Sequence, residues 1–111
     1  MKAAYTRDAP LNYEAVVFLD ESSGTSFELQ RALEFDAQDA ALGLATYCLS
    51  NTLGATHYGG VETWNLTPGS LTLSLSGEAA KALNLPRTLQ LHADAEELDQ
   101  LGHHIRRILS S

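Results

Sequence analysis

The alternation of apolar and polar positions predicts β-strands through most of the chain before residue 94. The near-continuous apolar segment Tyr13–Leu19 is typical of a strand buried on both faces. Residues 71–76 alternate leucine with threonine or serine, which predicts a strand with one buried face. Shorter strands are expected over Ala3–Arg7 and Leu89–Leu91. The first part of the chain is therefore expected to form mainly β-structure.

Segment Phe27–Phe35 also alternates, and Arg31 is the one charged residue on its apolar side. We predict a strand here, although the letters ELQRALEF also suit a short helix. The polar segment Asp20–Ser26, with Gly24 as its pivot, is expected to join this strand to the preceding one as a hairpin.

Segment Asp36–Gly43 predicts an irregular connection or a single helical turn, with Asp36 as its N-cap and Gly43 as its terminator. A strand is expected over Leu44–Asn51. Another is expected over His57–Leu66, in which two consecutive glycines indicate a bulge or a close backbone approach.

Two helices are predicted near the end of the chain. Segment Gly77–Asn84 consists mostly of good helix formers. Asp94, followed three residues later by Glu97, is typical of a helix start, and this second helix is expected over Ala95–Leu109. Its apolar stripe consists of Leu98, Leu101, Ile105, Ile108 and Leu109.

This order of elements predicts an α+β fold: a mainly antiparallel β-sheet with a short helix and a C-terminal amphipathic helix packed on one face. The length of 111 residues fits a single domain, which we assign to residues 1–111.

Composition and charge narrow the classes of partner. The formal net charge is −7, and residues 8–62 hold nine acidic residues against one basic residue, Arg31. Such a balance repels nucleic acids and anionic membranes and favours a basic partner. The single cysteine, and the lack of a signal peptide or an apolar membrane-spanning stretch, predict a cytoplasmic location.

No catalytic or cofactor motif is recognisable. There is no phosphate-binding loop and no nucleophile elbow, so we predict a protein that is not an enzyme and carries no cofactor. His103 and His104 are adjacent on a helix and point in different directions, which argues against a metal site. Cys48 suits a small core residue better than a reactive thiol.

The segment from His57 to Trp64 stands out because it gathers aromatic, acidic and glycine residues in a short stretch. Tyrosine and tryptophan are enriched at interface hot spots, and carboxylates beside them suit a basic partner. A tryptophan in a small β domain equally suits the core, so both interpretations of Trp64 stay open.

Three stretches together resemble the Immunity protein 10 family of bacterial polymorphic toxin systems. They are LQRALEFDAQDAALGLATYCLSN, THYGGVETWNL and LTLSLSGEAAKALNL, and the resemblance spans about residues 27–93. It implies an antidote that binds a cognate bacterial toxin domain in the cytoplasm and neutralises it, with a basic toxin such as a nuclease suiting the acidic charge. The charge asymmetry and the resemblance together indicate five partner-binding candidates: Asp36, Asp39, Tyr58, Glu62 and Trp64.

Two alternatives remain. A small-ligand-binding or regulatory domain would enclose a pocket lined by Tyr47, Tyr58 and Trp64. A homo-oligomeric structural module would pair through an exposed strand edge, and an antidote can form a homodimer as well.

Overall fold

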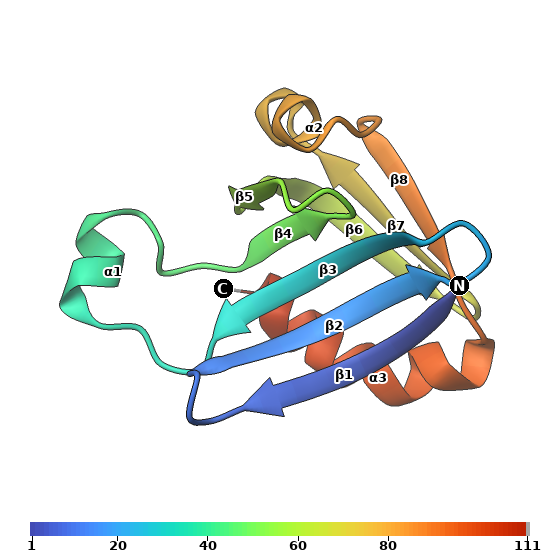
Figure 1. Ribbon diagram of the computed structural model, residues 1–111, viewed down its shortest axis with the longest axis horizontal. Coiled ribbons are helices and arrows are strands. Elements are labelled where there is room, and N and C mark those ends of the chain that lie inside the picture. The colour runs from blue at the N-terminus through green and yellow to red at the C-terminus, as the bar shows by residue number, and fades with distance from the viewer. Residues whose placement is uncertain (111) are drawn as a thin grey trace.

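Residues 1–110 are described by a computed structural model, in which they form two antiparallel sheets and three helices (Figure 1). The five-stranded sheet contains β1 (Lys2–Asp8), β2 (Tyr13–Asp20), β3 (Thr25–Ala32), β4 (Cys48–Asn51) and β5 (Thr56–Tyr58), in that order. The three-stranded sheet contains β6 (Val61–Thr67), β7 (Ser70–Leu75) and β8 (Thr88–His92). The helices are α1 (Ala37–Ala41), α2 (Gly77–Leu83) and α3 (Ala95–Leu109). The predicted α+β class is confirmed, with two sheets where one was expected.

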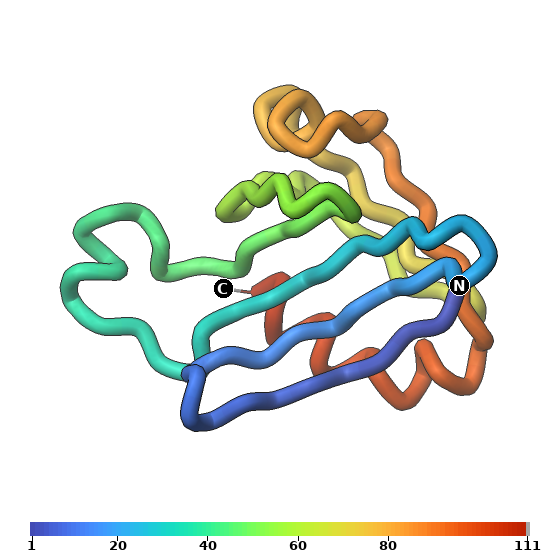
Figure 2. The backbone as a smooth tube through the Cα atoms, viewed as in Figure 1, coloured from blue at the N-terminus to red at the C-terminus, as the bar shows by residue number. Residues whose placement is uncertain are grey.

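The connection between β3 and β4 is longer than the sequence predicted. Strand β3 ends before Phe35, and β4 begins only at Cys48, because the pairing of the two strands ends at Gln30 and Cys48. Beyond that point the side chain of Asn12 holds the chain: its Oδ1 accepts a hydrogen bond from the Glu34 amide at 3.0 Å, and its Nδ2 donates to the Glu34 carbonyl at 3.1 Å. The released segment, residues 33–47, projects from the sheets and carries α1 (Figure 2).

The prediction of one strand over His57–Leu66 is wrong. Gly59 and Gly60 have φ values of +68° and +99°, which bend the chain out of the first sheet and into the second. A Cβ on Gly60 would lie 2.5 Å from the Cβ of Ala79, so a side chain has no room there. The two glycines therefore mark a crossing between sheets.

The core lies against one face of the five-stranded sheet, called here the inner face. This face carries the buried side chains of Val16, Phe18, Leu29 and Leu49. Helix α3 contacts β1, β2 and β3, and in Figure 1 it passes behind them. Its predicted apolar stripe is buried as expected, apart from the half-buried Leu101: Leu98, Ile105, Ile108 and Leu109.

Candidate partner-binding surface

Two acidic residues, Asp36 and Asp39, form the N-terminal cap of α1. Asp36 is the N-cap, and its Oδ1 accepts a hydrogen bond from the Asp39 amide at 2.7 Å, while Asp39 Oδ2 accepts one from the Asp36 amide at 3.1 Å. This reciprocal capping box fixes the start of a helix that buries no side chain. Each carboxylate uses one oxygen for the cap and keeps acceptor capacity for a partner.

Tyr58 and Asp39 lie at the same hollow, between the α1 segment and the end of the five-stranded sheet. The hollow has a volume of about 170 Å³, and its lining includes Tyr13, Gln30 and Phe35 as well. Tyr58 is 45% exposed on β5, where it stands opposite Cys48 of β4. The structure thus brings together three of the five sequence candidates, since Asp36 caps the helix that carries Asp39.

The other two candidates lie on β6, in the three-stranded sheet. Glu62 is exposed and forms an ion pair with Arg87, with Oε1 and the guanidinium nitrogen 2.8 Å apart. Trp64 stands opposite Leu73 and packs, partly buried, against the core. Neither residue lines the hollow beside α1.

The three rings expected of a small-ligand pocket do not come together. Tyr47 is buried in the core, where its hydroxyl accepts a hydrogen bond from the Val61 amide at 2.9 Å. Trp64 packs on the core from the second sheet, whereas Tyr58 is exposed. The structure therefore gives this alternative no support.

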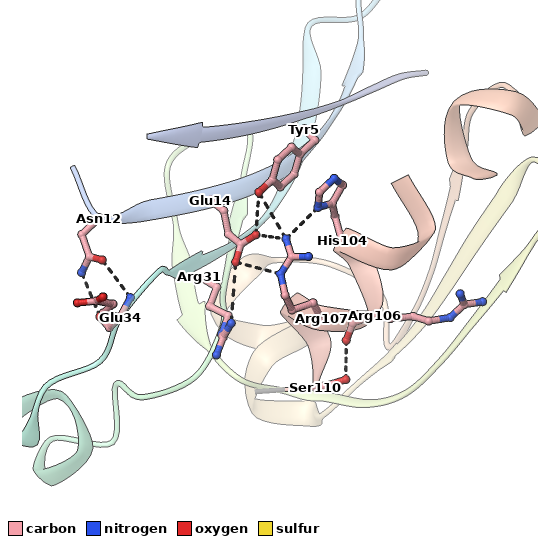
Figure 3. A network of polar contacts seen from close by, with 9 residues as sticks. All are labelled: Tyr5, Asn12, Glu14, Arg31, Glu34, His104, Arg106, Arg107 and Ser110. Carbon is pink, nitrogen blue, oxygen red and sulfur yellow. Dashed lines mark hydrogen bonds and ion pairs between the residues drawn. The ribbon is translucent and has the colours of Figure 1, made fainter. Parts of the chain in front are cut away.

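Sequence reasoning missed an ion-pair cluster on the inner face (Figure 3). Glu14 is only 3% exposed, and its carboxylate is bound by the Arg107 guanidinium. It also accepts a hydrogen bond from the Tyr5 hydroxyl at 2.9 Å, and Arg31 lies 3.9 Å away. Burial alone would raise the pKa of Glu14, but the hydrogen bonds from Arg107 and Tyr5 outweigh it and lower the pKa.

His104 extends this cluster to the surface of α3. Its ring stacks on Tyr5 with 3.6 Å between ring centroids, and its Nδ1 lies 2.8 Å from an Arg107 nitrogen. Arginine can only donate, so Nδ1 accepts and the imidazole is neutral. Partial burial, followed by the neighbouring charges of His103 and Arg107, lowers the pKa of His104.

A second residue missed by the sequence reasoning is Glu28, which stands on the opposite face of the sheet from the core. It is half-buried between Val17 of β2 and Ser50 of β4. Burial raises the pKa of Glu28. The strict alternation of β3 already placed Glu28 on the face away from Leu29, so the signal was present in the sequence.

Within residues 1–110, no group of three or more histidine, cysteine or acidic residues is arranged to hold a metal ion. Cys48 is buried, and burial raises the pKa of its thiol. None of the helices in this part of the chain has the length and apolar character needed to span a bilayer.

Comparison with known proteins identifies a family for this chain. Curated proteins and solved structures contain no significant match to this chain. The model of one protein family, described as Immunity protein 10, matches residues 2–100, a wider span than the three stretches noted in the sequence. The match includes every strand of both sheets and the first part of α3. The chain therefore belongs to the Immunity protein 10 family.

Proposed function

We propose that this protein is an immunity protein that binds a cognate bacterial toxin domain and neutralises it in the cytoplasm of the cell that makes it. The observation that carries the proposal is the family match over residues 2–100. It is a binding function, which needs no catalytic group and no cofactor. The charge of the chain supports it, because a net charge of −7 favours a basic protein partner.

The proposed contact surface begins at the hollow beside α1. Asp36, Asp39 and Tyr58 offer two carboxylates and a partly exposed aromatic ring within one region. Glu62 and Trp64 are proposed as contacts of a separate patch on β6, with a smaller contribution, because Glu62 already has Arg87 as its partner and Trp64 packs on the core. Buried aromatic anchors and charge pairs supply most of the affinity in protein complexes.

An acidic protein of this kind neutralises a basic toxin by occupying the surface that the toxin uses for its substrate. A nuclease is the toxin class that this mechanism suits best, since its active site must attract a polyanion. The long-range field of the acidic residues then speeds association, and salt slows it.

The proposal is tested with the toxin domain encoded beside this gene. Cells that express the toxin domain should survive only when this protein is co-expressed, and the two proteins should copurify as a complex. A toxin domain that remains lethal and does not bind would contradict the antidote function for that pair.

Association kinetics test the electrostatic part. The variant Asp36→Asn/Asp39→Asn removes two charges and keeps a good N-cap, because asparagine caps helices as well as aspartate does. Its association rate should be lower than that of the wild type at low salt and should approach it at high salt, with little change in the dissociation rate. Equal association rates at low salt would remove α1 from the interface while leaving the antidote function intact.

A further inference from the structure

The five-stranded sheet has a second face, opposite the core, called here the outer face. The strand register assigns to it two rows of residues that run across the sheet. One row is Ala4, Val17, Glu28, Ser50 and Thr56, and the other is Thr6, Ala15, Gln30, Cys48 and Tyr58. Most of these side chains are small; Ala15 and Cys48 are buried, and Val17, Glu28, Gln30 and Ser50 are half-buried.

Within residues 1–110, no helix or strand packs over the part of this face around Val17, Glu28 and Ser50, whereas the α1 segment lies beside Gln30 and Cys48 at one end. In Figure 1 the strands β1, β2 and β3 lie in front of α3, and no helix or strand lies in front of them. The tube in Figure 2 shows the same arrangement, with the α1 segment projecting beyond the end of the sheet rather than folding over it. The inner face, by contrast, is closed by α3.

Glu28 stands on the central strand of this face. The described part of the chain provides it with no hydrogen bond and no ion pair, although it is half-buried. The nearest strand positions on its face are occupied by Val17 and Ser50, neither of which carries a charge. A carboxylate held in this way is less well solvated than one in water and gains no compensation from the protein.

No basic side chain on the described strands of this sheet pairs with Glu28. Lys2, the one basic residue that the register places on the outer face, pairs with Glu21 at 3.3 Å. Arg31 and Arg107 both serve Glu14 on the inner face. Glu14 on the inner face therefore has two arginine partners, whereas Glu28 on the outer face has no basic partner within the described part of the chain.

We propose that the outer face docks a basic segment of the toxin, with a lysine or arginine side chain of that partner bound to Glu28. This inference rests on the proposed antidote function and names the surface on which it acts. Tyr58 lies two strands away and two residues along, at about 12 Å by the usual strand spacing and rise per residue. An extended partner segment laid across the face would place residues about four positions apart, whose side chains point to the same side, on Glu28 and on Tyr58. A cation on the Tyr58 ring or against Asp39 would continue the same contact.

The first experiment uses a simple cationic probe and does not depend on any toxin. Hexa-arginine with blocked ends is titrated into the ¹⁵N-labelled protein, and amide shifts are followed by NMR. The largest shifts should fall on the outer face around Val17, Glu28 and Ser50, and the variant Glu28→Gln should bind the peptide several-fold more weakly. Shifts that instead follow every exposed acidic residue equally would overturn the inference.

The second experiment uses the toxin domain encoded beside the gene. Glu28→Gln should raise the dissociation constant about tenfold, as expected when a hydrogen-bonded charge pair at a half-buried position is lost. The matched control is Glu78→Gln, which removes the same charge from an exposed position on α2. The control should bind within about twofold of the wild type, because long-range charge has a small effect at physiological salt.

The outcomes separate the two proposals. If the wild type binds the toxin and Glu28→Gln binds equally well, the outer face is not the docking surface and the antidote function stands. If the wild type does not bind the toxin at all, the antidote function fails for that pair, and the peptide titration alone decides whether the outer face receives a basic segment. Unchanged unfolding midpoints, or higher ones, must first show that each variant is folded.

Discussion

Glu14 and Glu28 lie on neighbouring strands of one sheet, but on opposite faces, and their surroundings differ in every respect. Glu14 is buried and bound by Arg107, Tyr5 and Arg31, so its pKa is lowered despite burial. Glu28 is half-buried and without a partner, so burial raises its pKa. Glu14 thus stabilises the fold through its ion pairs on the inner face, whereas Glu28 on the outer face has no ion pair within the described part of the chain.

The difference between Glu14 and Glu28 follows from where the few basic residues of the protein lie. The whole chain has 7 lysines and arginines against 14 acidic residues. Two of the arginines are used on a single inner carboxylate, where an unpaired charge would be most unfavourable. The outer face keeps its carboxylate unneutralised, which is unfavourable for stability and leaves Glu28 free to bind the basic partner proposed above.

The largest expected change in stability comes from packing on the inner face of the five-stranded sheet, compared with its outer face. Ile105→Ala removes a fully buried side chain of α3 that packs on the inner face, and should lower the free energy of unfolding by roughly 2 to 5 kcal/mol. Val17→Ala, on the outer face, is the matched control and should lower it by less than about 1 kcal/mol. Chemical denaturation measures both. Similar losses in the two variants would mean that α3 does not close the inner face.

The next effect concerns the inner carboxylate. Glu14→Gln leaves Arg107 and Arg31 without their charge partner and should lower the free energy of unfolding by roughly 1.5 to 3 kcal/mol, because charged hydrogen bonds are lost while the partly exposed Arg107 can be solvated. Because the folded pKa of Glu14 is lowered, its contribution is present above about pH 4.5 and is lost as the pH falls towards the folded pKa. Denaturation of wild type and variant across this range should show the difference shrinking in acid. A double-mutant cycle with Arg107→Gln checks that the two residues are coupled, and additive losses would contradict the pairing.

The outer carboxylate should behave in the opposite way. Glu28→Gln removes an unpaired, half-buried charge, so the thermal midpoint at neutral pH should stay the same or rise by a few degrees. The folded pKa of Glu28 is raised, so the wild type is at a disadvantage above that pKa and regains stability as Glu28 takes up a proton in acid. The gap between wild type and variant should therefore close towards pH 4. A clear fall in the midpoint at neutral pH would mean that Glu28 has a stabilising partner.

The smallest expected change in stability concerns His104, which stacks on Tyr5 at the edge of the ion-pair cluster. The lowered pKa of His104 means that the unfolded chain binds a proton more readily than the folded protein, so stability is full above about pH 6.5 and decreases below it. His104→Gln removes this group, and the stability of the variant should vary less between pH 7 and pH 5.5. Identical profiles would show that the stack on Tyr5 does not hold the imidazole in its neutral form.

The fold was predictable where local patterns decide it. The alternation in β7 and the apolar stripe of α3 placed both elements with nearly their observed bounds. The sequence also marked Gly59 and Gly60 as special, but a bulge and a crossing to a second sheet use the same residues. The strand pairing distinguishes them, because β5 pairs with β4 in the first sheet and β6 pairs with β7 in the second.

The candidate site was harder to predict because it depends on which residues share a face or a charge. Arg31 was noted as a charged exception on an apolar side, and its partner on the neighbouring strand could not be identified without the strand register. Asp39 and Tyr58 were proposed together and do share a hollow. Trp64, proposed with them, packs instead on the core from the other sheet.

The pairing of Glu14 with Arg107 also fixes an order of events during synthesis. Ninety-three positions separate the two residues along the chain, so Arg107 cannot bind the inner carboxylate until residue 107 has been made. Strands β1, β2 and β3 leave the ribosome first, and the helix that closes their inner face follows only after the strands of both sheets. At about 5 to 20 residues per second, that interval lasts several seconds. The inner face is therefore completed in one late step, when α3 docks, and not gradually as the strands appear.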